Sequence, residues 1–392
     1  MSKVKERMFS MQYLEHKNFP VFKQPQIRGY FSVDKDRKIK FDASNLRYYY
    51  EGTRLPKNKK ISLNLDANVD QAIKKDEFLK EIEQINHMLY YLKHNTEFHR
   101  STNLDDKKFF SFDFIAFRGL LTLILCTPYE RNEGWAINAS YFKGNIYLCD
   151  TITDQKRQNI LNANDKMKRC SSWGYKFEQY LLTSDPKISP DASKPVDENE
   201  EFCCIFETKI NNVQLLYGAE MDGILSDKKI DVNNPNDLNN VKFVELKTNR
   251  VIDNKRQYQN HLRYKYIKWW CQSFLVGIND ILVGFRNDQG KVLTLDNLEV
   301  NVIPKKVMGQ WSPSVCMNFL KEMLDFISFV IKNDENLKED DPDTVWQFVW
   351  KPPALNVEVK KYCGRSKETF LPEWFVNHVR TFEKRYKAEG VS

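Results

Sequence analysis

The sequence predicts a mixed α/β fold. Two observations lead to this prediction: several short stretches have strand composition, and two longer stretches carry apolar side chains at helical spacing. With 392 residues, of which 41% are hydrophobic and 13% aromatic, the chain has enough apolar surface for a sizeable core. By length alone, it could form one large domain or two.

The strand predictions begin with a hairpin. Residues 136–142 and 146–150 are rich in aromatic and branched side chains, and Lys143-Gly144-Asn145 between them is typical of a tight turn. The same composition predicts further strands at 202–210, 213–225, 241–248 and 281–286. The sequence Asn-Asp-Gln-Gly at 287–290 is a turn signal after the last of them.

Two helices are predicted from periodicity. Between Asp76 and Leu92, apolar residues recur every three or four positions, which indicates an amphipathic helix whose role is packing. Residues 256–276 place a broad aromatic stripe on a second helix and interleave it with the cations Arg256, Arg263, Lys265 and Lys268. Polar, proline-bearing stretches at 184–201, 226–240 and 333–344 are predicted to be surface loops.

Composition restricts the class of protein. Sixty basic residues against 53 acidic ones give a formal charge of +7, so any site for a polyanion must be a local patch. We expect a soluble, intracellular protein, because the sequence shows neither a signal peptide nor an apolar run of membrane-spanning length. The eight cysteines lack a Cys-x-x-Cys pattern, which favours reduced thiols, and Lys57-Asn-Lys-Lys60 is only a weak candidate for a nuclear signal.

Acidic side chains stand out in two of the predicted strands. Glu220 and Asp222 are two residues apart within the otherwise apolar run 213–225, so a continuous strand would point both to one face. Two such acids repel each other and call for a cation. In the next strand, Glu245 and Lys247 share one face by the same period, with Val244 and Leu246 on the other.

Several carboxylates that converge with one lysine suit phosphoryl hydrolysis. Carboxylate oxygens hold Mg²⁺ or Mn²⁺, a metal pair can bind both the attacking and the leaving oxygen, and a lysine can position water or neutralise developing charge. An ordinary explanation stays open, because an isolated Glu-Leu-Lys is common on the solvated face of a half-exposed strand. The Glu220 and Asp222 pair is harder to explain in that way.

Other chemistries find little support. The six histidines form neither a His-Glu-x-x-His nor a zinc-finger pattern. The chain also lacks the Gly-x-x-x-x-Gly-Lys-Ser/Thr, Gly-x-Gly-x-x-Gly and Gly-x-Ser-x-Gly sequences, which weakens nucleotide-triphosphatase, dinucleotide-binding and serine-hydrolase hypotheses.

At these residues the chain resembles the DXO/Rai family of RNA decapping and 5′-end quality-control enzymes. The similarity runs from about residue 100 to 375 and is weak before that. Its ordered motifs are similar to Phe117-Arg118-Gly119 followed by Thr127-Pro-Tyr-Glu130, Gly174-Tyr-Lys-Phe-Glu178, Glu220-Met-Asp222 and Glu245-Leu-Lys247. Further similar segments are 268–275, 284–286, 311–319 and 371–374.

The resemblance implies a single catalytic domain over 1–392, with two mixed β-sheets flanked by helices and a metal-dependent nuclease-like core. The motifs would span 118–272, and the C-terminal segments 311–375 would belong to the same fold. By this resemblance, two divalent cations are held by Glu178, Glu220, Asp222, Glu245 and the Leu246 carbonyl, with Glu220 acting through a bound water. Arg118, Lys247 and Gln272 would face the RNA phosphates.

Read without the resemblance, three of these residues have ordinary explanations. Glu178 would be an acid at the start of a helical segment, and Gln272 a polar residue beside buried tryptophans. Arg118 follows an apolar run and needs a partner; a phosphate and a structural salt bridge satisfy it equally well.

The activity implied is hydrolysis at the 5′ end of single-stranded RNA, on triphosphate ends and on incompletely methylated or non-canonical caps. Relatives differ in whether they also degrade RNA 5′→3′, and some bind a nuclear 5′→3′ exoribonuclease. The resemblance implies a nuclear location, with the cytoplasm as the alternative, and no membrane partner. Two other hypotheses stay open: a structure-selective DNA endonuclease with the same core, and a non-catalytic stabiliser of an exoribonuclease.

Overall fold

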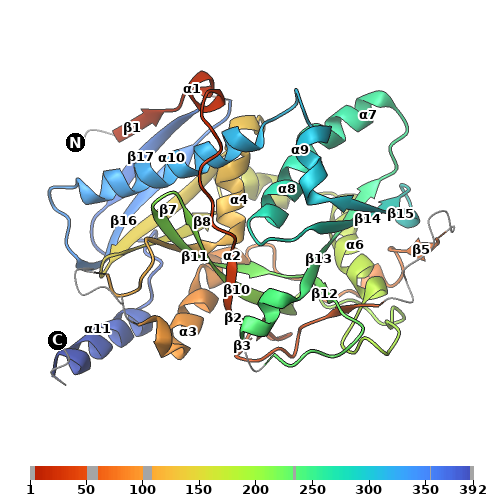
Figure 1. The fold of residues 1–392 in the computed structure, drawn as a ribbon, viewed down its shortest axis with the longest axis horizontal. Coiled ribbons are helices and arrows are strands. Elements are labelled where there is room, and N and C mark those ends of the chain that lie inside the picture. Colours follow the sequence, from red (N-terminus) through yellow and green to blue (C-terminus); the bar gives the residue numbers. More distant parts are fainter. Residues whose placement is uncertain (1–4, 51–60, 100–107, 233–234, 354, 389–392) are drawn as a thin grey trace.

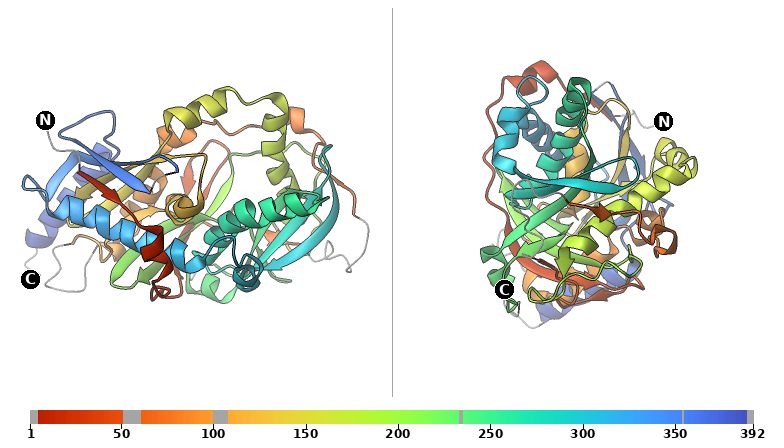
Figure 2. Two further views of the ribbon diagram at one scale, coloured as in Figure 1. Left: turned by 90° about the horizontal axis from the view of Figure 1, so that it is seen from above. Right: turned by 90° about the vertical axis from the view of Figure 1, so that its right-hand side faces the viewer.

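The structure is a computed structural model that describes residues 5–50, 61–99, 108–232, 235–353 and 355–388. Its strands form two sheets that succeed each other along the long axis of the molecule (Figure 1). The first strand and the last helix lie at the same end of that axis in two views (Figures 1 and 2). The chain therefore crosses to the far sheet and returns.

Ten strands form the longer sheet within the described residues. They are β1 (Lys5–Met8), β2 (Gln26–Val33), β3 (Ile39–Lys40), β6 (Phe114–Phe117), β7 (Trp135–Phe142), β8 (Asn145–Thr151), β10 (Glu201–Ile210), β11 (Val213–Glu220), β16 (Asp340–Trp350) and β17 (Asn356–Tyr362). Their order is β1-β17-β16-β7-β8-β6-β11-β10-β2-β3. The sheet is mixed, because β6 runs parallel to both β8 and β11 whereas the other neighbours are antiparallel.

The shorter sheet has seven strands in the same described part of the chain. They are β4 (Tyr48–Tyr49), β5 (Leu63–Asn64), β9 (Leu182–Thr183), β12 (Gly223–Leu225), β13 (Lys242–Arg250), β14 (Asp280–Arg286) and β15 (Lys291–Glu299). Their order is β5-β15-β14-β13-β12-β4-β9, with β13 parallel to β14 and β12 parallel to β4. The predicted α/β fold with two mixed sheets is thus confirmed.

Helices flank both sheets. They are α1 (Met11–Glu15), α2 (Leu79–Glu83), α3 (Asn86–His94), α4 (Arg118–Cys126), α5 (Asp154–Leu161), α6 (Asp165–Leu181), α7 (Lys255–Asn260), α8 (Tyr266–Phe274), α9 (Ile303–Lys306), α10 (Pro313–Lys332) and α11 (Glu373–Ala388). A π-helical turn at His261–Lys265 joins α7 to α8, so the helix predicted over 256–276 is present with this irregularity. Among the described helices, none is both long and apolar enough to cross a membrane.

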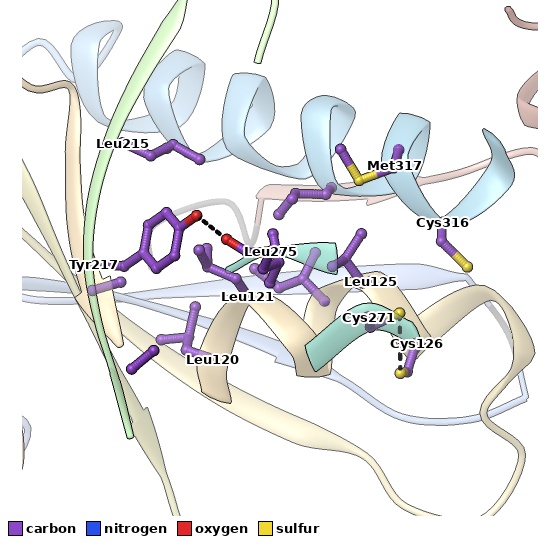
Figure 3. Packing of buried hydrophobic residues seen from close by; sticks show 14 of the residues in the cluster. Leu120, Leu121, Leu125, Cys126, Leu215, Tyr217, Cys271, Leu275, Cys316 and Met317 are labelled. Atoms are coloured by element: carbon purple, nitrogen blue, oxygen red, sulfur yellow. Dashed lines mark hydrogen bonds between the residues drawn. The ribbon is translucent and has the colours of Figure 1, made fainter. Parts of the chain in front are cut away.

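The largest hydrophobic core lies against both sheets. It joins Tyr217 of β11 in the longer sheet to Ile281 of β14 in the shorter one, and the Tyr217 hydroxyl donates a hydrogen bond to the Leu275 carbonyl after α8. Figure 3 shows Leu120 and Leu121 of α4 near this tyrosine, and further side chains of α4, α8 and α10 that extend the same core: Leu125, Cys126, Cys271, Cys316 and Met317. Because one core contacts both sheets, it determines how they meet.

The outer face of each sheet has its own core. On the longer sheet, Ile205 and Tyr147 pack with Leu89 of α3 and Phe375 of α11. On the shorter sheet, Val244 and Leu246 of β13 pack with Trp173, Phe177 and Leu181 of α6. Both sheets are therefore covered on two faces, as their apolar strands require.

One predicted helix is wrong in extent. The stretch 76–92 forms two helices, α2 and α3, which are separated at Gln84, where φ is 48°. A residue with left-handed backbone cannot continue a right-handed helix, so the apolar residues on the two sides of Gln84 do not lie on one continuous helical face. Met88 and Leu92 of α3 are buried, whereas Ile82 of α2 is 66% exposed.

The strand predictions need two corrections. The run 213–225 is not one strand, because β11 ends at Glu220 and β12 begins at Gly223 in the other sheet. The predicted loop 333–344 already contains the start of β16, at Asp340. The predicted hairpin is confirmed as β7 and β8, with left-handed backbone at Lys143 and Gly144 in its turn.

Candidate active site

The acidic residues meet where the chain passes from one sheet to the other. Glu220 is the last residue of β11, and Met221 and Asp222 form the link to β12. The sequence predicted that Glu220 and Asp222 share a face of one strand, and this is wrong because the strand is broken between them. Both nevertheless line the same cavity at the junction of the sheets.

The second pair of site residues lies on β13, beside β12. Gly223 is paired with Val244 in antiparallel register, which brings Asp222 next to Glu245. The Lys247 ammonium donates a hydrogen bond to Glu245 Oε1. The prediction that Glu245 and Lys247 share a face is confirmed, because the alternate residues of β13 pack into the core under α6.

Glu178 comes from the last turn of α6, not from the start of a helical segment as predicted. The carboxyl end of a helix carries partial negative charge, so an ionised carboxylate is disfavoured there. Burial raises the pKa of Glu178, and the neighbouring carboxylates of Asp222 and Glu220 raise it further. This electrostatic cost is relieved by a cation placed between the three groups.

Arg118 is the first residue of α4, directly after β6. Since β6 is the parallel neighbour of β11, the guanidinium lies at the same sheet edge as Glu220. Arg118 Nη1 is 3.7 Å from Glu245 Oε2, and both atoms are buried without a hydrogen-bond partner in the described structure. An ion pair at this distance leaves both groups able to bind a further ligand.

The remaining site pKa values are set by burial and by neighbouring charges. Glu220 is exposed at the cavity surface, yet the protein around its carboxylate removes hydrating water, and this together with the charge of Glu201 raises its pKa to about 7. Burial and then Glu245 raise the pKa of Asp222 to about 6. Burial also opposes ionisation of Glu245, but Lys247 and Arg118 outweigh it and lower its pKa. The pKa of Lys247 is raised because Glu245 and Asp222 overcome the effect of its burial.

Two cavities open onto this cluster. One, of about 320 Å³, is lined by Glu178, Glu220 and Asp222. The other, of about 410 Å³, is lined by Glu220 again and by Arg118, together with the rings of Phe31 and Phe117. Glu220 thus stands between an acidic cavity and one that combines cations with apolar side chains.

The donor set suits a hard divalent cation. Four carboxylates supply only oxygen donors, and Glu245 Oε2 is a buried acceptor without a partner. In the described residues, no three carboxylate, histidine or cysteine side chains are close enough to hold an ion as they stand. The contacts of Lys247 with Glu245, and of the Leu246 N–H with Asp222 Oδ2 at 2.6 Å, occupy two of the carboxylates.

Two of the predicted site residues, Leu246 and Gln272, make less direct contact with the acidic cluster than the others. The contact that Leu246 makes with the cluster is through its N–H, as a donor to Asp222. Gln272 is a half-buried residue of α8, which packs on α4 behind Arg118. Among the described side-chain hydrogen bonds and ion pairs, none joins Gln272 to the acidic residues.

Sequence reasoning missed a neighbouring ion-pair network. Glu201, in the strand beside β11, binds the Lys75 ammonium and lies 2.9 Å from Arg37 Nη1. Arg37 also donates to Glu83 Oε1 at 2.8 Å. Burial opposes the charge of Glu201, yet Lys75 and Arg37 lower its pKa. These residues come from segments far apart in the chain, so no local spacing could have revealed them.

Comparison with known proteins gives a consistent result. A family model described as RAI1 like PD-(D/E)XK nuclease matches residues 23–376. The decapping and exoribonuclease protein of Xenopus laevis is 32% identical over 367 residues, covering 92% of this chain and 88% of that protein. Its Homo sapiens counterpart is 32% identical over 362 residues, covering 91% and 86%.

Solved structures share the fold. Candida albicans Rai1 in complex with pU5 and Mn²⁺ has a TM-score of 0.77 at 21% identity, covering 96% of this chain and 99% of that one. S. pombe Rai1 in complex with 3′-FADP has a TM-score of 0.67 at 23% identity, covering 92% of this chain and 99% of that one. At these identities the likeness establishes the architecture.

Proposed function

Because the chain belongs to the RAI1-like PD-(D/E)XK nuclease family, we propose that it is a metal-dependent hydrolase of phosphate linkages at RNA 5′ ends. The observation that carries the proposal is the meeting of Glu178, Asp222 and Glu245 with Lys247 and Arg118 at the junction of the sheets. The carboxylates can bind the cations, and the two basic groups can bind phosphate oxygens. The names of the curated relatives, decapping and exoribonuclease protein, support RNA 5′ ends as the substrate.

The acidic residues would hold two Mg²⁺ or Mn²⁺ ions. Glu178, Asp222 and Glu245 are the direct ligands in this proposal, with the Leu246 carbonyl as a further ligand and Glu220 acting through water. When bound, such ions polarise the phosphate and lower the pKa of a coordinated water. Mn²⁺ in the Candida albicans Rai1 complex supports an ion of this kind.

Arg118 and Lys247 bind the phosphate. The fork of Arg118 suits two phosphate oxygens at once, and its buried Nη1 has no hydrogen-bond partner in the described structure. Lys247 can neutralise charge that develops on the reacting phosphate, and its buried position strengthens that interaction relative to water. Gln272, one turn of α8 beyond Lys268, is proposed as a further phosphate contact.

The single strand would approach along the exposed cations of α7 and α8. Lys265 and Lys268 are exposed, and they lie on the same side of the helix as Gln272. Although the side chain of Lys265 is exposed, the surrounding protein partly desolvates its ammonium; this effect, then repulsion from Lys268, Arg286 and Lys247, lowers the pKa of Lys265. Several cations therefore gather beside the catalytic lysine, where a polyanion would relieve their repulsion.

The cavity beside Arg118 would receive the terminal group. Its cations suit phosphates, and the half-buried ring of Phe117 suits a planar base. Water would attack a phosphate at or near the end, releasing pyrophosphate from a triphosphate end, or an incompletely methylated or non-canonical cap. A 5′→3′ exoribonuclease activity would follow from repeated attack on the shortened strand.

One substrate comparison tests this function. RNAs with monophosphate, triphosphate, unmethylated-cap and methylated-cap ends are incubated with Mg²⁺ or Mn²⁺, beside a circular RNA of the same sequence and the matching single-stranded DNA, and products are resolved by length. We expect hydrolysis at the triphosphate and unmethylated-cap ends and survival of the circle. Equal cleavage of circular RNA or preference for DNA supports an endonuclease instead, and complete inactivity with all RNAs supports the non-catalytic stabiliser.

We also propose a nuclear location and a nuclear 5′→3′ exoribonuclease as partner, since such an enzyme would consume the monophosphate product. The candidate signal Lys57-Asn-Lys-Lys60 lies outside the described residues. Imaging the tagged protein with and without alanine at the three lysines tests the location. Co-purification with exoribonuclease activity tests the partner.

A further inference from the structure

A small cavity lies next to the basic side of α8. It has a volume of about 140 Å³ and is lined by Tyr129, Glu130, Asn132, Arg263, Tyr264 and Lys268, among others. Small-molecule pockets usually begin at roughly 300 Å³, so this one suits a single planar group more than a whole ligand. Tyr264, which is 40% exposed, lies at its mouth.

The local backbone presents this tyrosine at the surface. Tyr264 belongs to the π-helical turn between α7 and α8, and such turns frequently occur at functional sites. The Arg263 guanidinium lies 5.4 Å from the centre of the Tyr264 ring. Lys268, one turn later, lines the same cavity, so an aromatic face is flanked by two cations.

Lys268 also connects this cavity to the active site. Its charge acts on Lys265, which is close enough to Lys247 to be repelled by it, and on Lys156, which lines the cavity beside Arg118. On the other side, Asn132 lines both the small cavity and a larger one of about 910 Å³. The larger cavity also shares Lys80, Asp150 and Ile152 with the cavity beside Arg118. Adjoining cavities therefore lead from the active site to the small cavity, and a strand could follow them.

One carboxylate in the cavity wall needs an explanation. Glu130 Oε1 accepts hydrogen bonds from the backbone N–H groups of Arg131 and Asn132, both at 2.9 Å, and of Glu133 at 3.4 Å. Its other oxygen is 3.8 Å from Lys268 Nζ, beyond hydrogen-bonding distance. Glu130 is thus engaged by its own loop and leaves the ammonium available to an anion.

We propose that this cavity is a subsite for one nucleobase of single-stranded RNA, downstream of the 5′ end. The base stacks on Tyr264, and the adjoining phosphate lies between Arg263 and Lys268. Stacking on an aromatic ring is available to every base, so the subsite is tolerant of sequence. The inference rests on the proposed function, because it gives the strand leaving the active site a second point of attachment.

The test measures binding of 5′-hydroxyl oligouridines of one to eight nucleotides by fluorescence anisotropy in EDTA, where no metal-dependent hydrolysis occurs. We expect the wild-type affinity to rise at the length that reaches the cavity. Tyr264→Ala should remove this rise and weaken binding of the longest RNA by about fivefold or more, whereas Tyr264→Trp should keep it. Tyr258→Ala is the matched control, since Tyr258 is 42% exposed on α7 and does not line the cavity.

A parallel assay with triphosphate-ended RNA and Mn²⁺ separates the two proposals. If the wild type hydrolyses this RNA but Tyr264→Ala keeps the full length dependence of binding, the subsite assignment is wrong and the proposed function stands. If Tyr258→Ala weakens binding as much as Tyr264→Ala, the effect is not specific to the cavity, and the assignment is again wrong. If the wild type hydrolyses none of the RNAs, the proposed function fails whatever the binding data show.

Discussion

Asp222 combines an unfavourable charge with a useful position. Burial and Glu245 raise its pKa to about 6, so in the absence of a cation its ionised form destabilises the fold at neutral pH. The same carboxylate accepts a hydrogen bond from the Leu246 N–H, which anchors it beside β13. A residue retained at such a cost is expected to serve the chemistry.

We therefore predict that Asp222→Asn lowers RNA hydrolysis by at least about 100-fold, because the proposed metal ligand loses its charge while the amide oxygen can still accept the Leu246 hydrogen bond. In EDTA at pH 7.5, the midpoint of thermal unfolding should be equal to or above that of the wild type. Asp227→Asn, on the exposed loop after β12, is the control and should change neither property. Wild-type activity of Asp222→Asn at saturating Mn²⁺ would contradict the assignment.

His261 determines part of the pH dependence of stability. Burial among aromatic rings, and then the charge of Lys265, lowers its pKa to about 4. Between pH 6.5 and 4 the unfolded chain takes up a proton at this residue and the folded chain does not, so stability falls as the pH is lowered through this range. The effect is about 3 kcal/mol at most, from the difference between the two pKa values.

We predict that His261→Phe reduces this acid sensitivity. Urea unfolding at pH 7.5, 6.0 and 4.5 should show a smaller loss of stability for the variant than for the wild type, whereas His16→Phe, at an exposed position, should behave like the wild type. An unchanged slope of stability against pH in His261→Phe would show that this histidine titrates normally in the fold.

At the scale of elements, the continuous segment α7, π turn and α8 has two tasks. Its inner side packs Trp269, Trp270 and Cys271 into the core that contacts both sheets. Its outer side carries the exposed cations Lys265 and Lys268. A helix with this division is often only structural, so the function of its outer side needs a separate test.

We predict that Lys265→Ala combined with Lys268→Ala weakens binding of single-stranded RNA and flattens its salt dependence. Each lost phosphate contact should reduce the slope of log K against log salt by roughly 0.7. Titrations between 50 and 300 mM salt, chosen to span roughly the range where counterion release is measurable, provide the measurement. Lys228→Ala combined with Lys229→Ala removes the same charge from an exposed loop and should leave the slope unchanged.

For the whole molecule, the region that holds the motifs and the C-terminal segments pack against each other. The strand β16 pairs with β7, and α10 contributes Phe319 and Ile327 to the core shared by both sheets. The site residues come from β11, β13, α4 and α6, which meet only when the two sheets are joined. We therefore propose that residues 1–392 form one domain.

This proposal predicts one cooperative thermal transition by calorimetry for the full chain. A variant that ends at residue 310 should lose that transition and expose apolar surface, because α10, β16, β17 and α11 are absent. Circular dichroism and dye binding would detect the loss. Two well-separated transitions, or a folded and active truncated chain, would show that the C-terminal segments are independent.

Local patterns in the sequence were enough for much of the site. The two-residue period of a strand placed Glu245 and Lys247 on one face of β13. Composition predicted the strands β7, β8, β10, β11, β13 and β14, and helical periodicity predicted the helix that contains Lys265 and Lys268. Such patterns are readable because neighbours in sequence share one backbone geometry. The resemblance of the ordered motifs then led to Glu178, which no local pattern singles out. It also gave a role to Arg118, which the apolar run before it had marked only as a cation in need of a partner.

Only the tertiary structure decided how these residues meet. It placed Glu220 and Asp222 on either side of a break between two sheets, Glu178 at the end of α6 instead of at the start of a helix, and Glu201 between Lys75 and Arg37 beside the acidic cluster. Each of these facts depends on strand pairing and core packing between segments far apart in the chain. Those contacts form because together they bury the apolar surface of the whole chain, and no short stretch of sequence is enough to specify them.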